Sequence, residues 1–143
     1  MNLSDLLSKG LVEKISSNPQ QVKDEIAIAK RDVASAKNVL TIDEWEVAHN
    51  LAYNAMLQSG TALMFSKGYR PKGQEHHVAV IEFVQVVYTA KFEPEVLQAF
   101  EKARKRRAQS VYDKVGLISE SQARYLVEKA EKFVNKALEL LQA

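Results

Sequence analysis

A basic segment over residues 102–107, Lys-Ala-Arg-Lys-Arg-Arg, carries five cations in six positions. Its last member, Arg107, falls on the side of the expected helix that carries Val96 and Phe100, because these positions lie within about 60° of one another at 100° per residue. A charge on an apolar stripe is costly unless it has a partner. A guanidinium matches phosphate through its planar fork of donors, so we interpret Arg107 as a phosphate ligand in a cleft. The alternative is a snorkelling arginine whose methylenes cover the core.

The remaining cations of this segment point away from the apolar stripe, toward solvent or a groove. The net charge of the chain is only +2, so any attraction to nucleic acid has to come from a local patch of this kind. A loop at residues 69–74 adds two more cations just before an expected helix. The phosphate-binding surface that we predict consists of Lys102, Arg104, Lys105, Arg106, Arg107, Arg70 and Lys72.

Two further side chains have the chemistry for proton transfer. His77 lies near the start of an expected helix at about residues 75–90, and the N-terminus of a helix favours phosphate. Histidine side chains in general titrate near neutrality and can transfer protons. Tyr112 follows Arg107 by five residues and is rotated about 140° from it, so the two converge only where the helix ends or bends, or where a second subunit supplies one of them. The catalytic candidates are therefore Arg107, Tyr112 and His77. The alternative for His77 and Tyr112 is ordinary packing.

Other chemistries have no support in the sequence. The chain has no cysteine, and its three histidines show no His-x-x-His or Glu-x-x-His spacing, so we expect no metal site. His49 lies on an apolar stripe between Trp45 and Ala52, where core packing is the default. Neither a glycine-rich phosphate loop nor a Gly-x-Ser-x-Gly motif occurs, and we expect no cofactor.

The elements that position these residues are predicted to be helices. Glycine and proline are scarce, 5 and 3 in the chain, and they separate long stretches of helical period. Thr41 is expected to cap a helix that carries Asp43 and Glu44 in its first turn. We predict an all-α fold, an up-and-down bundle of five to six helices, in a single domain over residues 1–143. The helices are expected at about residues 3–15, 19–40, 42–67, 75–90, 94–115 and 120–141.

The composition limits which cellular locations are expected for the protein. With 46% hydrophobic and 27% charged residues the chain has an ordinary globular composition. No apolar run approaches the roughly 20 residues of a membrane span, and the first residues lack the apolar core of a signal peptide. We therefore expect a cytoplasmic protein with no membrane contact.

Short segments of the chain resemble motifs of a prokaryotic subfamily of the HEPN domain family. Residues 52–56, Ala-Tyr-Asn-Ala-Met, are similar to its Tyr-Tyr-Ala-Met segment. Residues 77–83, His-Val-Ala-Val-Ile-Glu-Phe, are similar to its His-x-Gly-Val-x-x-Phe segment, and residues 107–112, Arg-Ala-Gln-Ser-Val-Tyr, to its Arg-x-x-Ala-Asp-Tyr segment. Residues 130–134 resemble the closing helix. The resemblance covers about residues 25–142, preceded by a short N-terminal helix.

The resemblance implies a helical bundle that dimerises. Many HEPN proteins are metal-independent ribonucleases, often toxins paired with a small nucleotidyltransferase antitoxin, and their signature is Arg-x4–6-His. In this chain Tyr112 stands where that histidine would follow Arg107. Arg70 and His76 have the formal spacing, but they span a Pro/Gly loop elsewhere in the bundle.

We therefore expect a HEPN-like homodimer that binds RNA or a nucleotide as part of a toxin–antitoxin or defence-type module. Two alternatives remain open. One is a metal-independent ribonuclease that uses Arg107 with His77 or Tyr112, in which the arginine stabilises charge at the phosphate. The other is a non-catalytic interaction partner of a nucleotidyltransferase.

Overall fold

Helices make up most of the computed structural model, which describes residues 1–112 and 118–142, with side chains left out at 109–112. The all-α prediction is confirmed, with one small addition, a pair of short strands. The elements of the described residues are α1 (Leu3–Ser8), β1 (Val12–Lys14), α2 (Pro19–Leu40), α3 (Trp45–Ser66), β2 (Tyr69–Pro71), α4 (His76–Val87), α5 (Pro94–Tyr112) and α6 (Glu120–Gln142).

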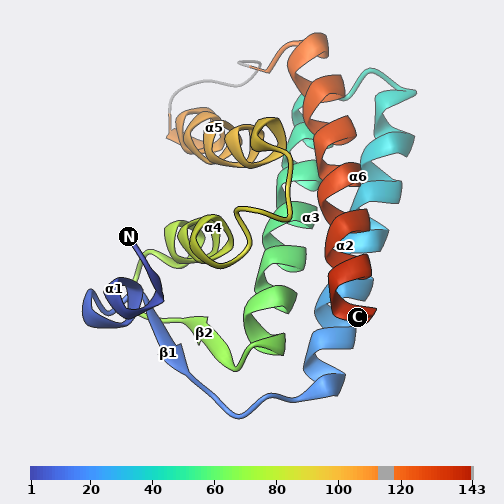
Figure 1. Ribbon diagram of the computed structural model, residues 1–143. Helices are drawn as coiled ribbons and strands as arrows, with labels where there is room; N and C mark the ends of the chain where they lie inside the picture. Colours follow the sequence, from blue (N-terminus) through green and yellow to red (C-terminus); the bar gives the residue numbers. More distant parts are fainter. Residues whose placement is uncertain (113–117, 143) are drawn as a thin grey trace.

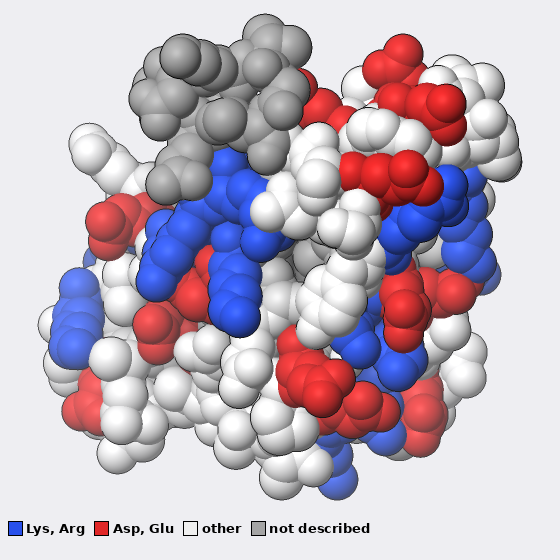
Figure 2. All heavy atoms as spheres, turned by 90° about the horizontal axis from the view of Figure 1, so that it is seen from above, with Lys and Arg blue, Asp and Glu red and all other residues white. Residues whose placement is uncertain are grey.

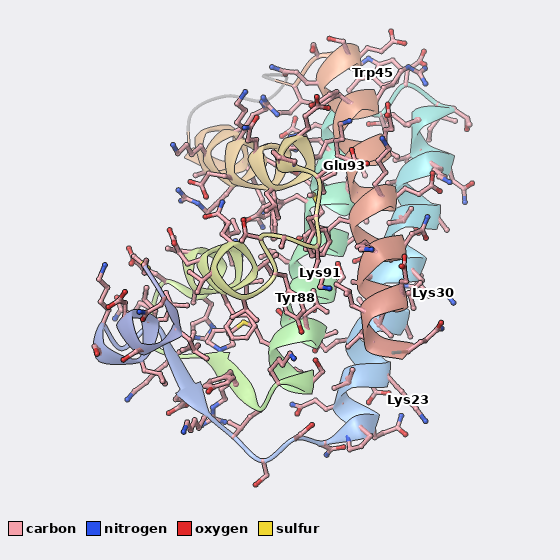
Figure 3. All side chains as sticks on the ribbon, in the orientation of Figure 1. Lys23, Lys30, Trp45, Tyr88, Lys91 and Glu93 are labelled. Carbon is pink, nitrogen blue, oxygen red and sulfur yellow. The ribbon has the colours of Figure 1, made fainter. Side chains whose placement is uncertain are left out.

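The three longest helices, α2, α3 and α6, lie side by side, and α4 and α5 are seen nearly end-on beside them (Figure 1). α4 and α5 therefore run across α3 and contact it on its left side in this view. α1 packs on α4, at the lower left. The outer side of α2 faces solvent, where Lys23 and Lys30 project from it (Figure 3). No helix in the described part of the chain is long and apolar enough to cross a membrane.

The N-terminal prediction is wrong in part. A helix was expected over residues 3–15, but α1 ends at Ser8, and Gly10 adopts a φ of 71° that terminates the helical path. The chain then forms β1, which pairs antiparallel with β2, Val12 opposite Pro71. The predicted loop at 69–74 is thus partly a strand. Both strands have only three residues, too few for a local pattern to show.

The boundary between α2 and α3 also differs from the prediction. The N-cap of α2 is Asn18, whose side chain accepts hydrogen bonds from the backbone N–H groups of residues 20 and 21, and Pro19 follows at the first helical position. Thr41, expected to begin the next helix, instead closes α2, and its hydroxyl donates to the Asn38 carbonyl at 2.6 Å. Asp43 then adopts a φ of 60°, so α3 starts only at Trp45.

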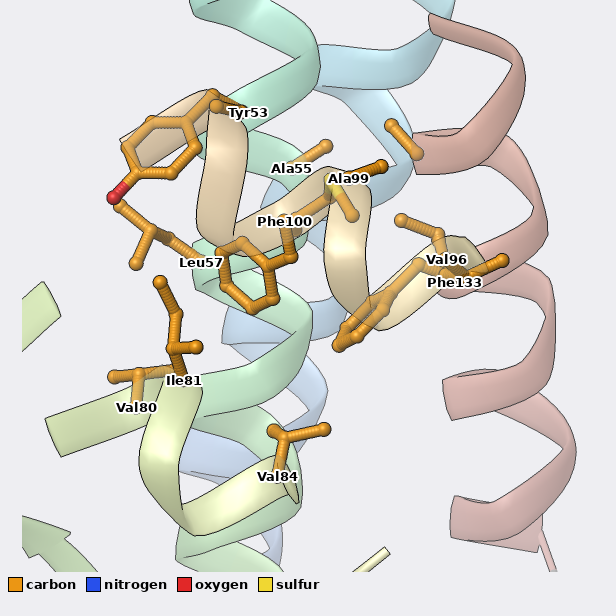
Figure 4. Close-up of a cluster of buried hydrophobic side chains, with 14 of the residues drawn as sticks. Tyr53, Ala55, Leu57, Val80, Ile81, Val84, Val96, Ala99, Phe100 and Phe133 are labelled. Atoms are coloured by element: carbon orange, nitrogen blue, oxygen red, sulfur yellow. The ribbon is translucent and has the colours of Figure 1, made fainter. Parts of the chain in front are cut away.

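Aromatic side chains join α3, α5 and α6 in the core. The ring of Phe100 lies edge-on to both Tyr53 and Phe133, with centroid distances of 5.9 and 5.3 Å (Figure 4). α4 is held against α3 at Gly60, where an added Cβ would lie 2.7 Å from Cγ1 of Val80. Tyr88, which follows α4, is buried and its ring lies 6.4 Å from that of Phe83; the connection that carries Lys91 and Glu93 follows it (Figure 3). The position of α4 and α5 relative to α3 is therefore fixed by close contacts.

Candidate functional site

The basic segment of α5 divides into exposed lysines and half-buried arginines. Lys102 and Lys105 are exposed, as expected for a solvent-facing surface. Arg104 and Arg106 were predicted to point toward solvent or a groove, and both are half-buried, as Arg107 is. Helix α5 lies across α3. Because of this crossing, more of the α5 surface is covered than the single apolar stripe of α5 indicates. Three guanidinium groups therefore lie against the body of the protein.

Arg106 contacts a histidine that has no exposure to solvent. Its Nη1 atom lies 3.3 Å from Nε2 of His49. Because a guanidinium has donors only, Nε2 has to accept, which requires the neutral imidazole. Burial, and then the charge of Arg106, lower the pKa of His49 to about 4. His49 thus anchors α5 to α3 as a neutral acceptor, in agreement with its expected place in the core.

Arg107 lies over the ring of Tyr53, with Cζ 5.7 Å from the ring centroid. The phenol oxygen of Tyr53 lies 2.9 Å from Nδ1 of His77, and the two rings are tilted at a centroid distance of 5.6 Å. Burial raises the pKa of Tyr53 well above its ordinary value, so the phenol keeps its proton. Three residues from α5, α3 and α4 therefore form one contact chain, and the structure brings Arg107 and His77 together through a tyrosine.

His77 is held in its neutral form by the same surroundings. Its pKa is lowered, first by burial and then by the positive charges of Arg107, His76 and Arg104. A neutral imidazole has one donor and one acceptor nitrogen. Because Tyr53 engages Nδ1, the direction of that hydrogen bond decides what Nε2 offers to a ligand.

A surface hollow of about 500 Å³ lies between α4 and α5, and both His77 and Arg107 line it. Arg104 lines it as well, with its Nη2 donating to Glu101 Oε1 at 2.8 Å, and Glu75 supplies a carboxylate at the start of α4. Seen from above, one group of lysine and arginine side chains lies left of the centre of the molecule and others lie on its right side, with acidic side chains directly beside them (Figure 2). The hollow therefore combines cations with carboxylates that limit how many of those cations reach a ligand.

The other predicted residues lie elsewhere or outside the described part. The side chain of Tyr112, at the end of α5, is outside the described residues. Arg70, on β2, donates from Nε to Glu13 Oε1 at 2.6 Å and borders a different hollow, while Lys72 is exposed after that strand. The structure does not bring Arg70 to the hollow that holds Arg107.

Two residues of the site were not among the predicted ones. Tyr53 connects Arg107 to His77, and Glu101 pairs with Arg104. A signal for Tyr53 existed, because it lies four positions after His49 and within the segment 52–56. Glu101 lies three residues before Arg104, the spacing of a helical ion pair. No group of three potential metal ligands occurs within residues 1–112 and 118–142 that the structure describes.

With this geometry in place, the comparison with known proteins gives one family. The HEPN domain matches the chain over residues 22–141, nearly its whole length. The chain belongs to the HEPN domain family. No curated protein matches it.

Proposed function

We propose that this chain binds RNA or a nucleotide through phosphate contacts in the hollow between α4 and α5. The observation that carries the proposal is the shared lining of that hollow by Arg107 and His77, at the N-terminal turn of α4. A guanidinium, an imidazole and a helix N-terminus all favour a phosphate oxygen. Membership of the HEPN family supports the same class of ligand.

Preorganisation supports this binding role. The contact with the Tyr53 ring and half-burial restrict the Arg107 guanidinium before a ligand arrives. If the Tyr53 hydroxyl donates to Nδ1, His77 carries its proton on Nε2 and offers a second donor to the phosphate. Arg104 donates a hydrogen bond to the Glu101 carboxylate, which offsets much of its charge. We therefore assign Arg104 a supporting role in phosphate binding.

The neutral state of His77 favours a second candidate function, a metal-independent ribonuclease. If Nδ1 instead donates to the Tyr53 oxygen, Nε2 is free to accept a proton from a ribose 2′-hydroxyl. Arg107 would stabilise the charge that develops as this oxygen attacks the adjacent phosphate. Cleavage of labelled RNA in the presence of a chelator, lost in both Arg107→Ala and His77→Ala, would support this function; intact RNA after prolonged incubation would contradict it.

The proposal extends to assembly. HEPN-family membership supports a homodimer, and the proposal includes a nucleotidyltransferase of a toxin–antitoxin module as a further partner. Light scattering on the purified chain tests the dimer. A strict monomer at micromolar concentration would contradict a site to which two subunits contribute residues. Co-purification with a co-expressed nucleotidyltransferase tests the second partner.

Binding itself is tested by fluorescence anisotropy with a labelled single-stranded RNA at low salt. Arg107→Ala should weaken binding about ten- to hundredfold, the usual range for a lost charge-assisted hydrogen bond, and should reduce the salt dependence of the affinity. Arg124→Ala is the matched control, because it removes an exposed arginine on α6 that lines neither histidine-containing hollow. Equal affinities of Arg107→Ala and the parent protein would refute the proposed function.

A further inference from the structure

A second hollow, of about 550 Å³, shares His76 and His77 with the one between α4 and α5. Its other walls come from α3, from β2, from the segment that joins β1 to α2 and from the start of α2. A ligand that extends from one hollow into the other passes this histidine pair. Hollows of this volume accommodate groups of the size of a nucleoside.

The α3 wall of the second hollow combines uncharged hydrogen-bonding groups with apolar side chains. Gln58 and Thr61 are half-buried there, one helical turn apart, and Phe65 follows as a buried aromatic ring. Among the described residues, the Gln58 amide makes no hydrogen bond. The Thr61 hydroxyl donates to the Leu57 carbonyl at 2.8 Å, so its oxygen keeps acceptor capacity. This wall therefore offers donors, acceptors and an apolar surface within about two turns of a helix.

The charges at the second hollow do not favour another phosphate. Arg70 borders it, but Glu13 holds the Arg70 Nε at 2.6 Å and offsets its charge. An amide presents both a donor and an acceptor, which is the pattern that pairs with the edge of a nucleobase. The chemistry of the hollow thus fits a neutral, flat, hydrogen-bonding ring.

Part of this hollow is built outside the family match. Ile15, Ser16, Asn18 and Gln21 line it, and all four precede residue 22, where the match to the HEPN domain begins. Asn18 is fixed as the N-cap of α2, and the backbone N–H of Ile15 donates to the Gly68 carbonyl at 2.8 Å. The wall is therefore an ordered feature of this chain that the family match does not describe.

We propose that the second hollow binds the base of the nucleotide whose phosphate lies against His77 and Arg107. The inference rests on the proposed function and adds a specificity site to it: Gln58, Thr61 and Gln21 contact the base, and the histidine pair separates base from phosphate. The ligand is one nucleotide unit, either free or within an RNA strand.

The experiment compares an oligoribonucleotide with one of equal length in which stable abasic units replace the bases. The parent protein should bind the base-containing strand more tightly by about five- to a hundredfold, the range expected for one held base. Gln58→Leu should lose most of this preference while its affinity for the abasic strand stays unchanged. Gln21→Ala repeats the test at an exposed residue that carries little risk for folding, and Gln98→Leu, on the exposed side of α5, is the matched control.

The outcomes separate the two proposals. If the parent protein binds both strands equally, or if neither glutamine variant changes the preference, the base site is wrong and phosphate binding stands. If Arg107→Ala leaves both affinities unchanged, the proposed function fails and the base site fails with it. Competition by nucleoside monophosphates, compared with ribose 5-phosphate, distinguishes a free nucleotide from an RNA strand as the source of the base.

Discussion

Tyr53 on α3 and His77 on α4 are joined by a contact of 2.9 Å between the phenol oxygen and Nδ1. Arg107 of α5 lies over the ring of the same tyrosine. Tyr53 is fully buried and also packs against Phe100, so a core residue fixes the positions of the two side chains that reach the hollow. The proposed site is therefore supported by the interior of the bundle and not by a loop.

Tyr53→Phe tests this support. The phenyl ring keeps the packing and most of the contact with Arg107, but Nδ1 of His77 loses its partner. Because a lost neutral hydrogen bond costs about 1 kcal/mol, we expect a small loss of stability in urea unfolding and a several-fold loss of RNA affinity. The ¹⁵N chemical shifts of the His77 ring should change, because the ring is no longer held in one tautomer. Tyr125→Phe, at an exposed position, is the control and should change neither; an unchanged His77 spectrum in Tyr53→Phe would contradict the positioning role.

The parts of the fold that local sequence determines were predictable. The Asn18-Pro19 pair marks the start of α2, and the apolar period of α6 marks its length, because caps and amphipathic stripes are properties of consecutive residues. The β1–β2 pair was not predictable, since it joins Val12 to Pro71 across most of the N-terminal half of the chain. Short-range periodicity carries no information on such a pairing.

The site was predictable only at the level of single residues. The helical stripe singled out Arg107, but it placed Arg106 toward solvent or a groove and did not indicate that Arg106 reaches the buried His49. The reason is that α5 crosses α3 and rests on two of its turns, so neighbouring arginines contact His49 and Tyr53 in succession. The crossing of two helices is a tertiary property, and a single-helix projection does not contain it.

Gly60→Ala should destabilise the docking of α4 on α3. In an isolated helix the change is favourable by about 1 kcal/mol. Here the new Cβ would meet Cγ1 of Val80 at 2.7 Å, and a β-branched side chain has little freedom to move away. We expect a net loss of roughly 1–3 kcal/mol, typical of overpacking, measured by urea unfolding.

The double variant Gly60→Ala with Val80→Ala is the control for this prediction. If the clash is the cause, the double variant should lose less unfolding free energy than the two single variants lose in sum, because removing the Val80 methyls relieves the contact. Strict additivity would show that Gly60 does not position α4.

Acid should destabilise the protein through His49. Its folded-state pKa of about 4 lies below the ordinary value of 6.5, so the unfolded chain binds more protons between these values. The stabilising contribution is present above pH 6.5 and is lost as the pH falls toward 4, up to about 3 kcal/mol. The raised carboxyl pKa values of Glu25 and Asp32 act in the opposite direction, so a variant comparison is required.

The comparison is with His49→Gln, whose amide oxygen still accepts from Arg106 but does not titrate. Unfolding free energies measured at pH 7 and pH 4.5 should fall further for the parent protein than for His49→Gln. Equal losses would mean that His49 is not the group that couples folding to proton binding in this range.

Arg106 and Arg107 should separate stability from binding, although they are consecutive and carry the same charge. Arg106→Ala leaves the buried Nε2 of His49 without its donor, which costs roughly 1–3 kcal/mol of folding stability. It should change RNA affinity only through net charge, at most a few-fold. Arg107→Ala should show the reverse, a large loss of RNA affinity with a smaller loss of stability, because its guanidinium lines the hollow. Thermal unfolding and anisotropy on the same two preparations measure both quantities. Equal effects of the two variants on RNA affinity would mean that the segment acts as a diffuse basic surface, and the specific role of Arg107 would then be lost.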